Sequence, residues 1–162
     1  MDLVLPVREN LELRLLNMSN AETFFNAIRK NDKHLREWFG WLDYDKTVGD
    51  IEKYIKESTE RFSRKEGIDL KIWYKNELVG AIGLFPWDRE HKKTSIAYWL
   101  SEEFQGKGIM TDSLKVVIDY IFTEMKLNRI EINCAVKNEK SSAIPKKLGF
   151  TFEGIAREGN WL

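Results

Sequence analysis

Residues 94–136 constrain the fold most, because they place a strand, a helix and a second strand in direct succession. Apolar and polar residues alternate over residues 94–100, as they do in a half-buried strand. Apolar side chains then recur every three or four positions over residues 109–125, which predicts a helix of about four turns with one face on a sheet. Alternation returns at residues 129–136. Two strands joined in this way run parallel through a right-handed crossover.

The segments before this unit predict an antiparallel meander. Residues 11–16 alternate like a strand, and residues 68–74 and 77–85 form two further strands separated by a short polar turn. Two helices are expected between the first two strands. One opens with SNAE (residues 19–22) and the other with TVGD (residues 47–50), and each is a capping box in which a hydroxyl and a carboxylate satisfy free amides.

After the crossover, a short helix is expected from its cap at Asn138 to Gly149, followed by a last strand at residues 150–156. The predicted fold class is therefore α/β (α+β), with a mixed, mostly antiparallel sheet and flanking helices. The sequence has no repeats and no linker, and its 162 residues fit one domain spanning residues 1–162.

Composition narrows the class of function. Lys plus Arg and Asp plus Glu number 26 each, so no overall field draws the chain to nucleic acid or to an anionic membrane. The N-terminus lacks a signal-like pattern and no apolar run has the length of a membrane span, which predicts a cytoplasmic protein. The one cysteine, Cys134, cannot form an internal disulfide and is expected in the core, on one face of an alternating strand. No metal-ligand spacing is present.

Two glycines, Gly106 and Gly108, stand where the helix of residues 109–125 begins. A helix start presents amides without partners and a partial positive charge, and both favour anion binding. Residues without side chains leave that backbone open to a ligand, and Lys107 adds charge beside it. The loop is neither a Walker A sequence nor a dinucleotide fingerprint. The alternative interpretation is a glycine turn that merely joins a strand to a helix.

The pattern Gln105-x-x-Gly108-x-Met110 resembles the Q-x-x-G-x-(G/A) loop with which GCN5-related N-acetyltransferases (GNAT) hold the pyrophosphate of coenzyme A. Methionine replaces the last small residue of that motif. Three segments, AYWLSEEFQGKGIMTDSL, NEKSSAIPKKLGFTFEG and HLREWFGWLDY, resemble the RimJ/RimL-type branch of ribosomal-protein serine/alanine N-acetyltransferases. The resemblance implies the GNAT fold, in which two parallel strands splay apart, and an acetyltransferase that uses acetyl-CoA.

The resemblance also assigns two groups of residues to acetyl-CoA. The pantetheine arm contacts the backbone of Tyr98, Trp99 and Leu100 together with Asn138 and Ser141, and the pyrophosphate is held by Gln105, Gly106, Lys107, Gly108, Ile109, Met110 and Thr111.

Ser141 is the predicted catalytic residue. Many family members have a tyrosine three residues before the leucine of the LGF motif, where a hydroxyl can donate a proton to the departing thiolate, but this chain has Pro145 there. Ser141 matches the family's Asn-x-x-Ser hydroxyl near the thioester sulfur, so the role of donor or relay falls to it. The alternative is that Ser141 only caps or packs its helix. That helix is expected to bend or end at Pro145, because proline inside a regular helix costs roughly 3 kcal/mol.

The acceptor implied by this branch is a protein N-terminal α-amine. The family's usual carboxylate early in the strand of residues 94–100 is not evident, since Ser95 stands there. A site without a strong base suits an α-amine, which is deprotonated at about 3.4 kcal/mol lower cost than lysine because its pKa is about 2.5 units lower. The expected acceptor contacts are Trp38, Trp41, Asp43 and Tyr44, although aromatic residues in this segment also fit a core between two helices.

Two other functions stay open on the sequence. The acceptor could be a small amine such as a polyamine or an antibiotic, and Pro145 with Ser95 suggests a catalytically impaired acyl-CoA-binding module. Family members usually continue past residue 162 into one more strand. Either the sequence is incomplete or another chain supplies that strand, so a homodimer is expected.

Overall fold

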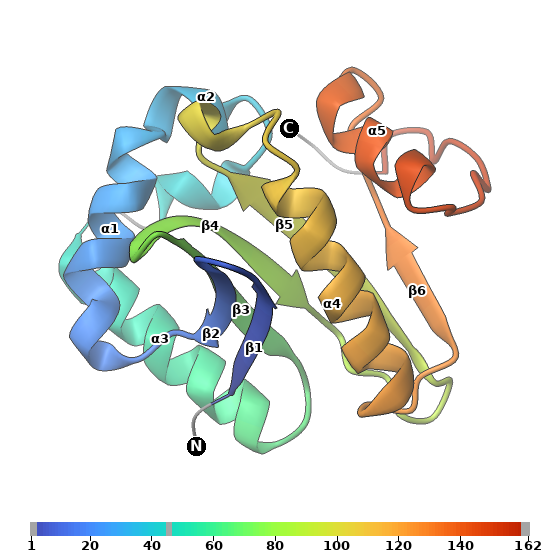
Figure 1. The fold of residues 1–162 in the computed structure, drawn as a ribbon, viewed down its shortest axis with the longest axis horizontal. Helices are drawn as coiled ribbons and strands as arrows, with labels where there is room; N and C mark the ends of the chain where they lie inside the picture. The colour runs from blue at the N-terminus through green and yellow to red at the C-terminus, as the bar shows by residue number, and fades with distance from the viewer. Residues whose placement is uncertain (1–2, 45–46, 160–162) are drawn as a thin grey trace.

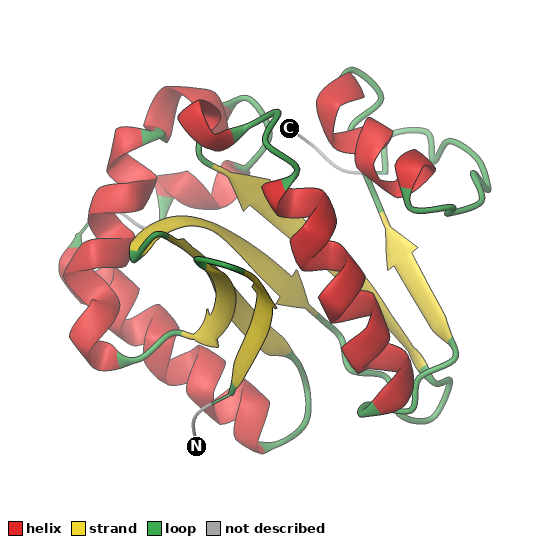
Figure 2. Ribbon diagram, viewed as in Figure 1, coloured by secondary structure: helices red, strands yellow, loops and turns green. Residues whose placement is uncertain are grey.

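The computed structural model describes residues 3–44 and 47–159. Within these residues, a six-stranded sheet in the order β1-β2-β3-β4-β5-β6 carries helices on both faces (Figures 1 and 2). The strands are β1 (Val4–Arg8), β2 (Leu11–Leu15), β3 (Ile68–Tyr74), β4 (Glu77–Leu84), β5 (Lys93–Leu100) and β6 (Arg129–Ile132). The α-helices are α1 (Ala21–Lys30), α2 (Asp32–Arg36), α3 (Val48–Ser63), α4 (Ile109–Thr123) and α5 (Glu139–Lys147), with short 3₁₀ turns at Met18–Asn20, Gly40–Asp43 and Glu102–Phe104.

The sheet is mixed, as the sequence predicts. Neighbouring strands are antiparallel from β1 to β5, and β5 and β6 are parallel. The predicted hairpin of β3 and β4 turns on Lys75 and Asn76, whose φ values of 50° and 65° belong to the left-handed region that tight hairpin turns require. Helix α4 forms the crossover between the parallel strands (Figure 1).

Each face of the sheet has its own core. Alternate residues of β2, β3 and β4 pack with Leu114, Val117 and Ile121 of α4 in one cluster. The other faces of these strands pack with α1 and α3 in a second cluster that includes Trp73 and Trp99. Apolar alternation thus fixes which face each strand residue meets.

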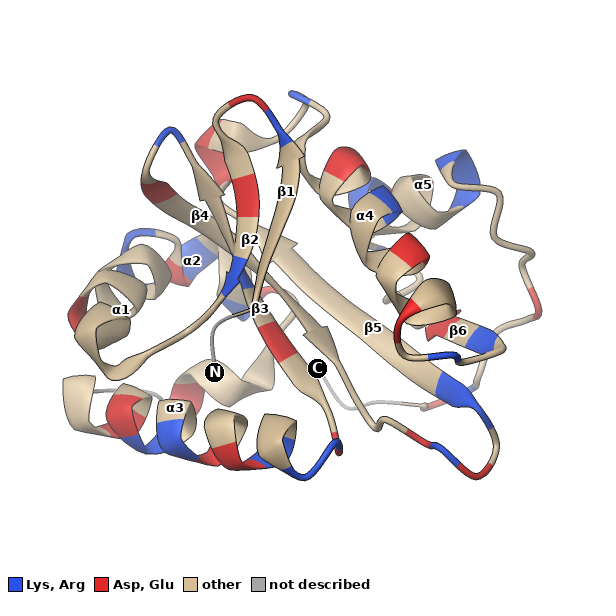
Figure 3. Cartoon of the chain, turned by 60° about the horizontal axis from the view of Figure 1, so that its bottom comes forward, with Lys and Arg blue, Asp and Glu red and all other residues tan. Residues whose placement is uncertain are grey.

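Charged residues of both signs are interspersed over the molecule, for example along α3 (Figure 3). In the described part of the chain, no helix combines the length and the apolar character that a membrane crossing requires.

Three sequence predictions about the elements were wrong or incomplete. No strand forms at residues 150–156, because a strand needs a neighbour to hydrogen-bond and none pairs with the outer edge of β6 among the described residues. Strand β6 ends at Ile132 rather than at residue 136. The SNAE box does not form either, since a 3₁₀ turn precedes α1 and the Ser19 hydroxyl bonds Asn17 instead. The TVGD box of Thr47 and Asp50 is confirmed.

Candidate active site

Strands β5 and β6 pair only at their beginnings. Their register runs from Lys93 with Arg129 to Ile96 with Ile132, where β6 ends. Strand β5 continues to Leu100, paired on its other side with β4. Among the described residues, no strand pairs with the α5-facing edge of residues 97–100, so an extended ligand can bond that edge. This is the splayed parallel pair predicted from the sequence.

The glycine loop follows directly on the end of β5. Gly106 and Gly108 have φ values of +75° and +74°, which favour glycine strongly. Gly108 is the N-cap of α4, and the first helical bond runs from the Asp112 amide to the Gly108 carbonyl at 2.9 Å. The amides of residues 109–111 therefore precede the first helical donor and face the helix start.

Basic residues lie beside this loop, one of them paired with an acidic side chain. Arg8 of β1 bonds the Asp112 carboxylate at 3.0 Å and the Lys107 carbonyl at 3.4 Å. Lys140 of α5 bonds the Gln105 amide oxygen at 3.3 Å. Bare amides, left-handed glycines and a basic rim fit a diphosphate group. The Met110 side chain is buried in the core, so a larger residue at this position of the motif leaves the amides uncovered.

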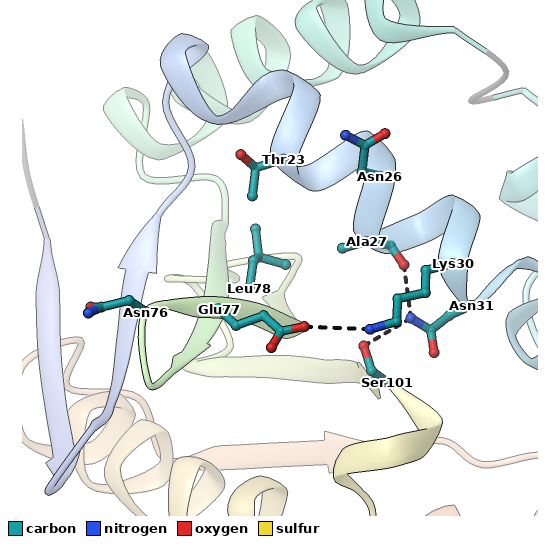
Figure 4. Close-up of a pocket in the computed structure, with 9 residues that line it drawn as sticks. All are labelled: Thr23, Asn26, Ala27, Lys30, Asn31, Asn76, Glu77, Leu78 and Ser101. Carbon is teal, nitrogen blue, oxygen red and sulfur yellow. Dashed lines mark hydrogen bonds and ion pairs between the residues drawn. The ribbon is translucent and has the colours of Figure 1, made fainter.

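Buried Asn31, at the end of α1, fixes the loop relative to the helices on the other face. Its amide nitrogen donates to the Ala27 carbonyl at 2.9 Å and to the Ser101 hydroxyl at 3.0 Å, as Figure 4 shows. Its amide oxygen accepts from the Glu102 amide at 3.1 Å. A second link joins His34 of α2 to Gln105 at 2.9 Å. The approach to the glycine loop is therefore held by α1 and α2.

Ser141 lies in the first turn of α5, opposite the unpaired edge of β5. Its amide donates to the Asn138 side chain at 3.1 Å, which confirms Asn138 as the cap of this helix. Its hydroxyl lies 3.3 Å from the Tyr98 hydroxyl and 3.5 Å from the Cys134 sulfur. Cys134 is half-buried beside this hydroxyl and outside the two apolar cores, so its predicted core position was wrong: β6 ends before the alternation reaches it.

Of the two outcomes predicted at Pro145, an early end of the helix was wrong, and a bend stays a prediction. Helix α5 continues to Lys147, two residues past the proline. The structure accommodates the missing amide because the Ser141 carbonyl, which residue 145 would have bonded, accepts a hydrogen bond from the Tyr98 hydroxyl at 2.7 Å. Gly149, at φ +82°, ends the helix as predicted.

A cavity of about 420 Å³ lies on the α1 and α3 side of the sheet. Its lining combines aromatic residues with a small polar group, and it comprises Phe24, Phe39, Trp41, Tyr44, Tyr54, Arg61, Asp69, Lys71, Ala81, Gly83, Phe85, Ala97, Tyr98 and Trp99. Because Ala97, Tyr98 and Trp99 belong to β5, this cavity and the unpaired strand edge share one strand.

Asp69 is the centre of a buried polar network in this cavity. It accepts hydrogen bonds from the Tyr54 hydroxyl at 2.8 Å, the Ser58 hydroxyl at 2.9 Å and the Arg61 guanidinium at 2.7 Å. Burial alone would raise the pKa of Asp69, but the charge of Lys71 and the bonds from Arg61, Tyr54 and Ser58 lower it below its ordinary value. Asp69 is therefore an occupied acceptor and a poor general base.

Lys71 lies beside this network and is almost fully buried, with 1% of its surface exposed. Its ammonium group bonds the Tyr54 hydroxyl at 3.2 Å and lies 4.5 Å from the ring centre of Phe24. Cation–π contacts of this kind stabilise a buried charge.

The four predicted acceptor residues are separated by the fold. Trp41 and Tyr44 line the cavity, whereas Trp38 and Asp43 are not among its lining residues. The Asp43 carboxylate instead bonds Arg36 at 2.5 Å.

Sequence reasoning missed Asp69 and Lys71. A signal was present, because these two charges alternate with Ile68, Leu70 and Ile72 in a strand whose apolar face is fully buried. Two charges on the second face of a central strand indicate a polar site whenever helices cover that face.

Comparison with known proteins agrees with this geometry. Residues 10–151 match the acetyltransferase (GNAT) domain family. The chain belongs to the GNAT acetyltransferases. A putative ribosomal N-acetyltransferase of Bacillus subtilis, YdaF, is 36% identical over 154 residues, which cover 94% of this chain and 84% of that protein. The ribosomal-protein-serine acetyltransferase of Escherichia coli is 27% identical over 158 residues, covering 98% of this chain and 88% of the relative.

One similar solved structure contains the cofactor. RimL, a ribosomal L7/L12 α-N-protein acetyltransferase in complex with coenzyme A, has a TM-score of 0.94 and 27% identity, covering 98% of this chain and 90% of its own. In that complex coenzyme A forms a disulfide with a cysteine. The RimJ/RimL-type resemblance is thus confirmed, and with it an acetyl-CoA-dependent N-acetyltransferase.

Proposed function

We propose that this enzyme transfers the acetyl group of acetyl-CoA to the N-terminal α-amine of a ribosomal protein. One observation carries the proposal: the unpaired edge of β5 and the aromatic cavity meet at residues 97–99 of a single strand. A donor held along the edge and an acceptor entering through the cavity would reach each other there. The ribosomal-protein acetyltransferases among its relatives support this acceptor class.

On the donor side, the amides of residues 109–111 and the glycines before them would hold the pyrophosphate, with Lys107 and Lys140 adding charge. The backbone of residues 98–100 would bond the pantetheine arm as a neighbouring strand would. When bound, acetyl-CoA supplies a thioester whose sulfur leaves as a thiolate.

Ser141 would face that sulfur. Its hydroxyl lies between Tyr98 and Cys134, at the place where β5 and β6 separate. A hydroxyl there can donate a hydrogen bond to developing negative charge. In a relative, coenzyme A is linked to a cysteine, and in this chain Cys134 beside Ser141 would lie near the cofactor sulfur. The capping bond from Ser141 to Asn138 uses only the backbone amide. The hydroxyl, which donates to the Tyr98 oxygen, would turn this donor to the sulfur.

On the acceptor side, Trp41 and Tyr44 would contact the peptide, and Trp38 and Asp43 stay predictions. Asp69 is the one carboxylate among the described lining residues, and its low pKa and three donors make it a weak proton acceptor. An amine that is already partly neutral near pH 8 suits such a site better than a lysine side chain. A ribosomal acceptor would place the reaction in the cytoplasm.

A panel assay tests this function. The enzyme is incubated with acetyl-CoA and peptides that begin with serine or alanine, with the same peptides blocked at the N-terminus, with spermidine and with an aminoglycoside. Release of the CoA thiol measures the rate, and mass spectrometry locates the acetyl group. We expect acetylation of the free peptides at the α-amine only.

Acetylation of spermidine or the antibiotic alone would show that the acceptor is a small amine. The protein would still be an acetyltransferase. Tight acetyl-CoA binding without transfer to any amine would favour the acyl-CoA-binding module. The homodimer expected from the sequence stays a prediction, which sedimentation of the purified protein would test.

A further inference from the structure

Pro145 leaves one carbonyl of α5 without its usual helical donor. Each amide of an α-helix normally donates to the carbonyl four residues earlier, so residue 145 would serve Ser141. Proline has no amide hydrogen, yet the helix runs on to Lys147. The Ser141 carbonyl therefore lacks its helical donor, and it accepts a hydrogen bond from outside the helix instead.

Tyr98 supplies that donor from a different element. Its hydroxyl bonds the Ser141 carbonyl at 2.7 Å, from β5 on the far side of the opening between β5 and β6. The same hydroxyl oxygen accepts from the Ser141 side chain at 3.3 Å. Tyr98 thus contacts both polar groups of Ser141 that remain once Asn138 has taken its amide.

We propose that Tyr98 is the positioning residue for Ser141, through a link that replaces the amide missing at Pro145. The inference rests on the proposed function, in which Ser141 faces the thioester sulfur. The phenol fixes the backbone of the first turn of α5 against β5 and orients the Ser141 hydroxyl at the strand opening. The Tyr98 hydroxyl takes the place of the amide that Pro145 lacks, so the two residues act as a pair.

The proton of Tyr98 stays in place during this role. Burial raises the pKa of Tyr98 well above its usual value, although the bond from Ser141 lowers it in part and Cys134 raises it further. Tyr98 therefore holds Ser141 as a neutral donor and does not itself act as an acid.

A double-mutant cycle tests the link in the full-length enzyme with a peptide acceptor. Tyr98→Phe removes only the hydroxyl and should lower kcat about tenfold, the equivalent of one lost hydrogen bond, with the KM for acetyl-CoA nearly unchanged. In a Ser141→Ala background the same change should lower kcat less than about twofold, because Tyr98 acts through Ser141. Tyr120→Phe, which removes the hydroxyl of a half-buried tyrosine on α4, is the matched control and should leave kcat unchanged.

Equal losses in both backgrounds, or no loss from Tyr98→Phe, would overturn the positioning role. Thermal unfolding tests the hydrogen bond between Tyr98 and the Ser141 carbonyl independently of catalysis. Tyr98→Phe should lower Tm by about 3 °C, and adding Pro145→Ala should restore it because alanine returns an amide to the Ser141 carbonyl. If the wild type acetylates no amine, the proposed function fails, whereas an unrescued double variant refutes the link itself.

Discussion

Gly108 offers the sharpest test of the cofactor loop. A side chain at this position has two effects, a backbone cost to folding and a block to the cofactor. They can be separated because Gly108 has a φ of +74° and open space around its Cα. The nearest protein atom to an added Cβ is an Asp112 carboxylate oxygen at 3.6 Å, which is ordinary contact. Gly108→Val therefore meets no protein clash at its Cβ, and its cost to folding is the left-handed backbone, at least about 1–2 kcal/mol.

Gly149 is a matched control for that backbone cost. Its φ of +82° is close to that of Gly108, and among the described residues no atom beyond its chain neighbours lies within 4 Å of an added Cβ. Gly149→Val should thus lower the free energy of unfolding by a similar amount, a decrease in Tm of about 3–6 °C for a chain of this size. Gly149 lies outside the proposed phosphate contacts, so coenzyme A should bind this variant as it binds the wild type.

Binding of coenzyme A is where the two variants should differ. A side chain at residue 108 keeps the diphosphate from the amides at the start of α4, and losing two charge-assisted bonds costs about 3 kcal/mol, roughly 100-fold in Kd. Isothermal titration calorimetry of both variants measures this, with circular dichroism melts for stability. Wild-type affinity in Gly108→Val, or equal losses in both variants, would refute the assignment of the loop.

Three further predictions concern the site and its support. Ser141→Ala should lower kcat more than it weakens coenzyme A binding, and an unaffected rate would return the hydroxyl to a structural role. Asp69→Asn should cost about 3 kcal/mol in urea unfolding at pH 7, because Arg61 is left without its buried partner. The pKa of Asp69 is lower in the folded state than in the unfolded state, so its carboxylate stabilises the fold fully above about pH 4. This stabilisation disappears as the pH falls through the folded pKa. The Asp69→Asn variant should therefore lose less stability on acidification than the wild type. Thr47→Ala should cost about 1 kcal/mol, seen as a lower Tm, by removing the cap of α3; an unchanged Tm would contradict the capping box.

Local patterns predicted the elements that carry the proposed donor half of the site. The β5, loop and α4 unit depends on residue alternation, helical periodicity and glycine, which are all properties of neighbours in the sequence. The same holds for the cap at Asn138 and the αL glycine at 149. The fold places these elements as predicted because each carries its own signal.

The proposed acceptor half depends on contacts between distant residues. Asp69 reaches its donors on α3, and Lys71 packs on Phe24 of α1, so their roles need the packing of three elements. The Tyr98 bond to Ser141 joins positions 43 residues apart and compensates a proline that was expected to disturb the helix. Residues 150–156 show the converse, since alternation alone forms no strand without a hydrogen-bonding neighbour.

Strands β5 and β6 stop pairing at Ile96 and Ile132, so a bound ligand would complete hydrogen bonds that folding leaves open on β5. An extended amide-bearing molecule seated on residues 97–100 would behave as a temporary strand, shielding peptide groups that otherwise exchange with solvent. Deuterium uptake there and protease access to α5 should then fall when the nucleotide binds and rise again after it departs. The edge of β5 and helix α5 would in this way gain and lose protection once in every catalytic cycle.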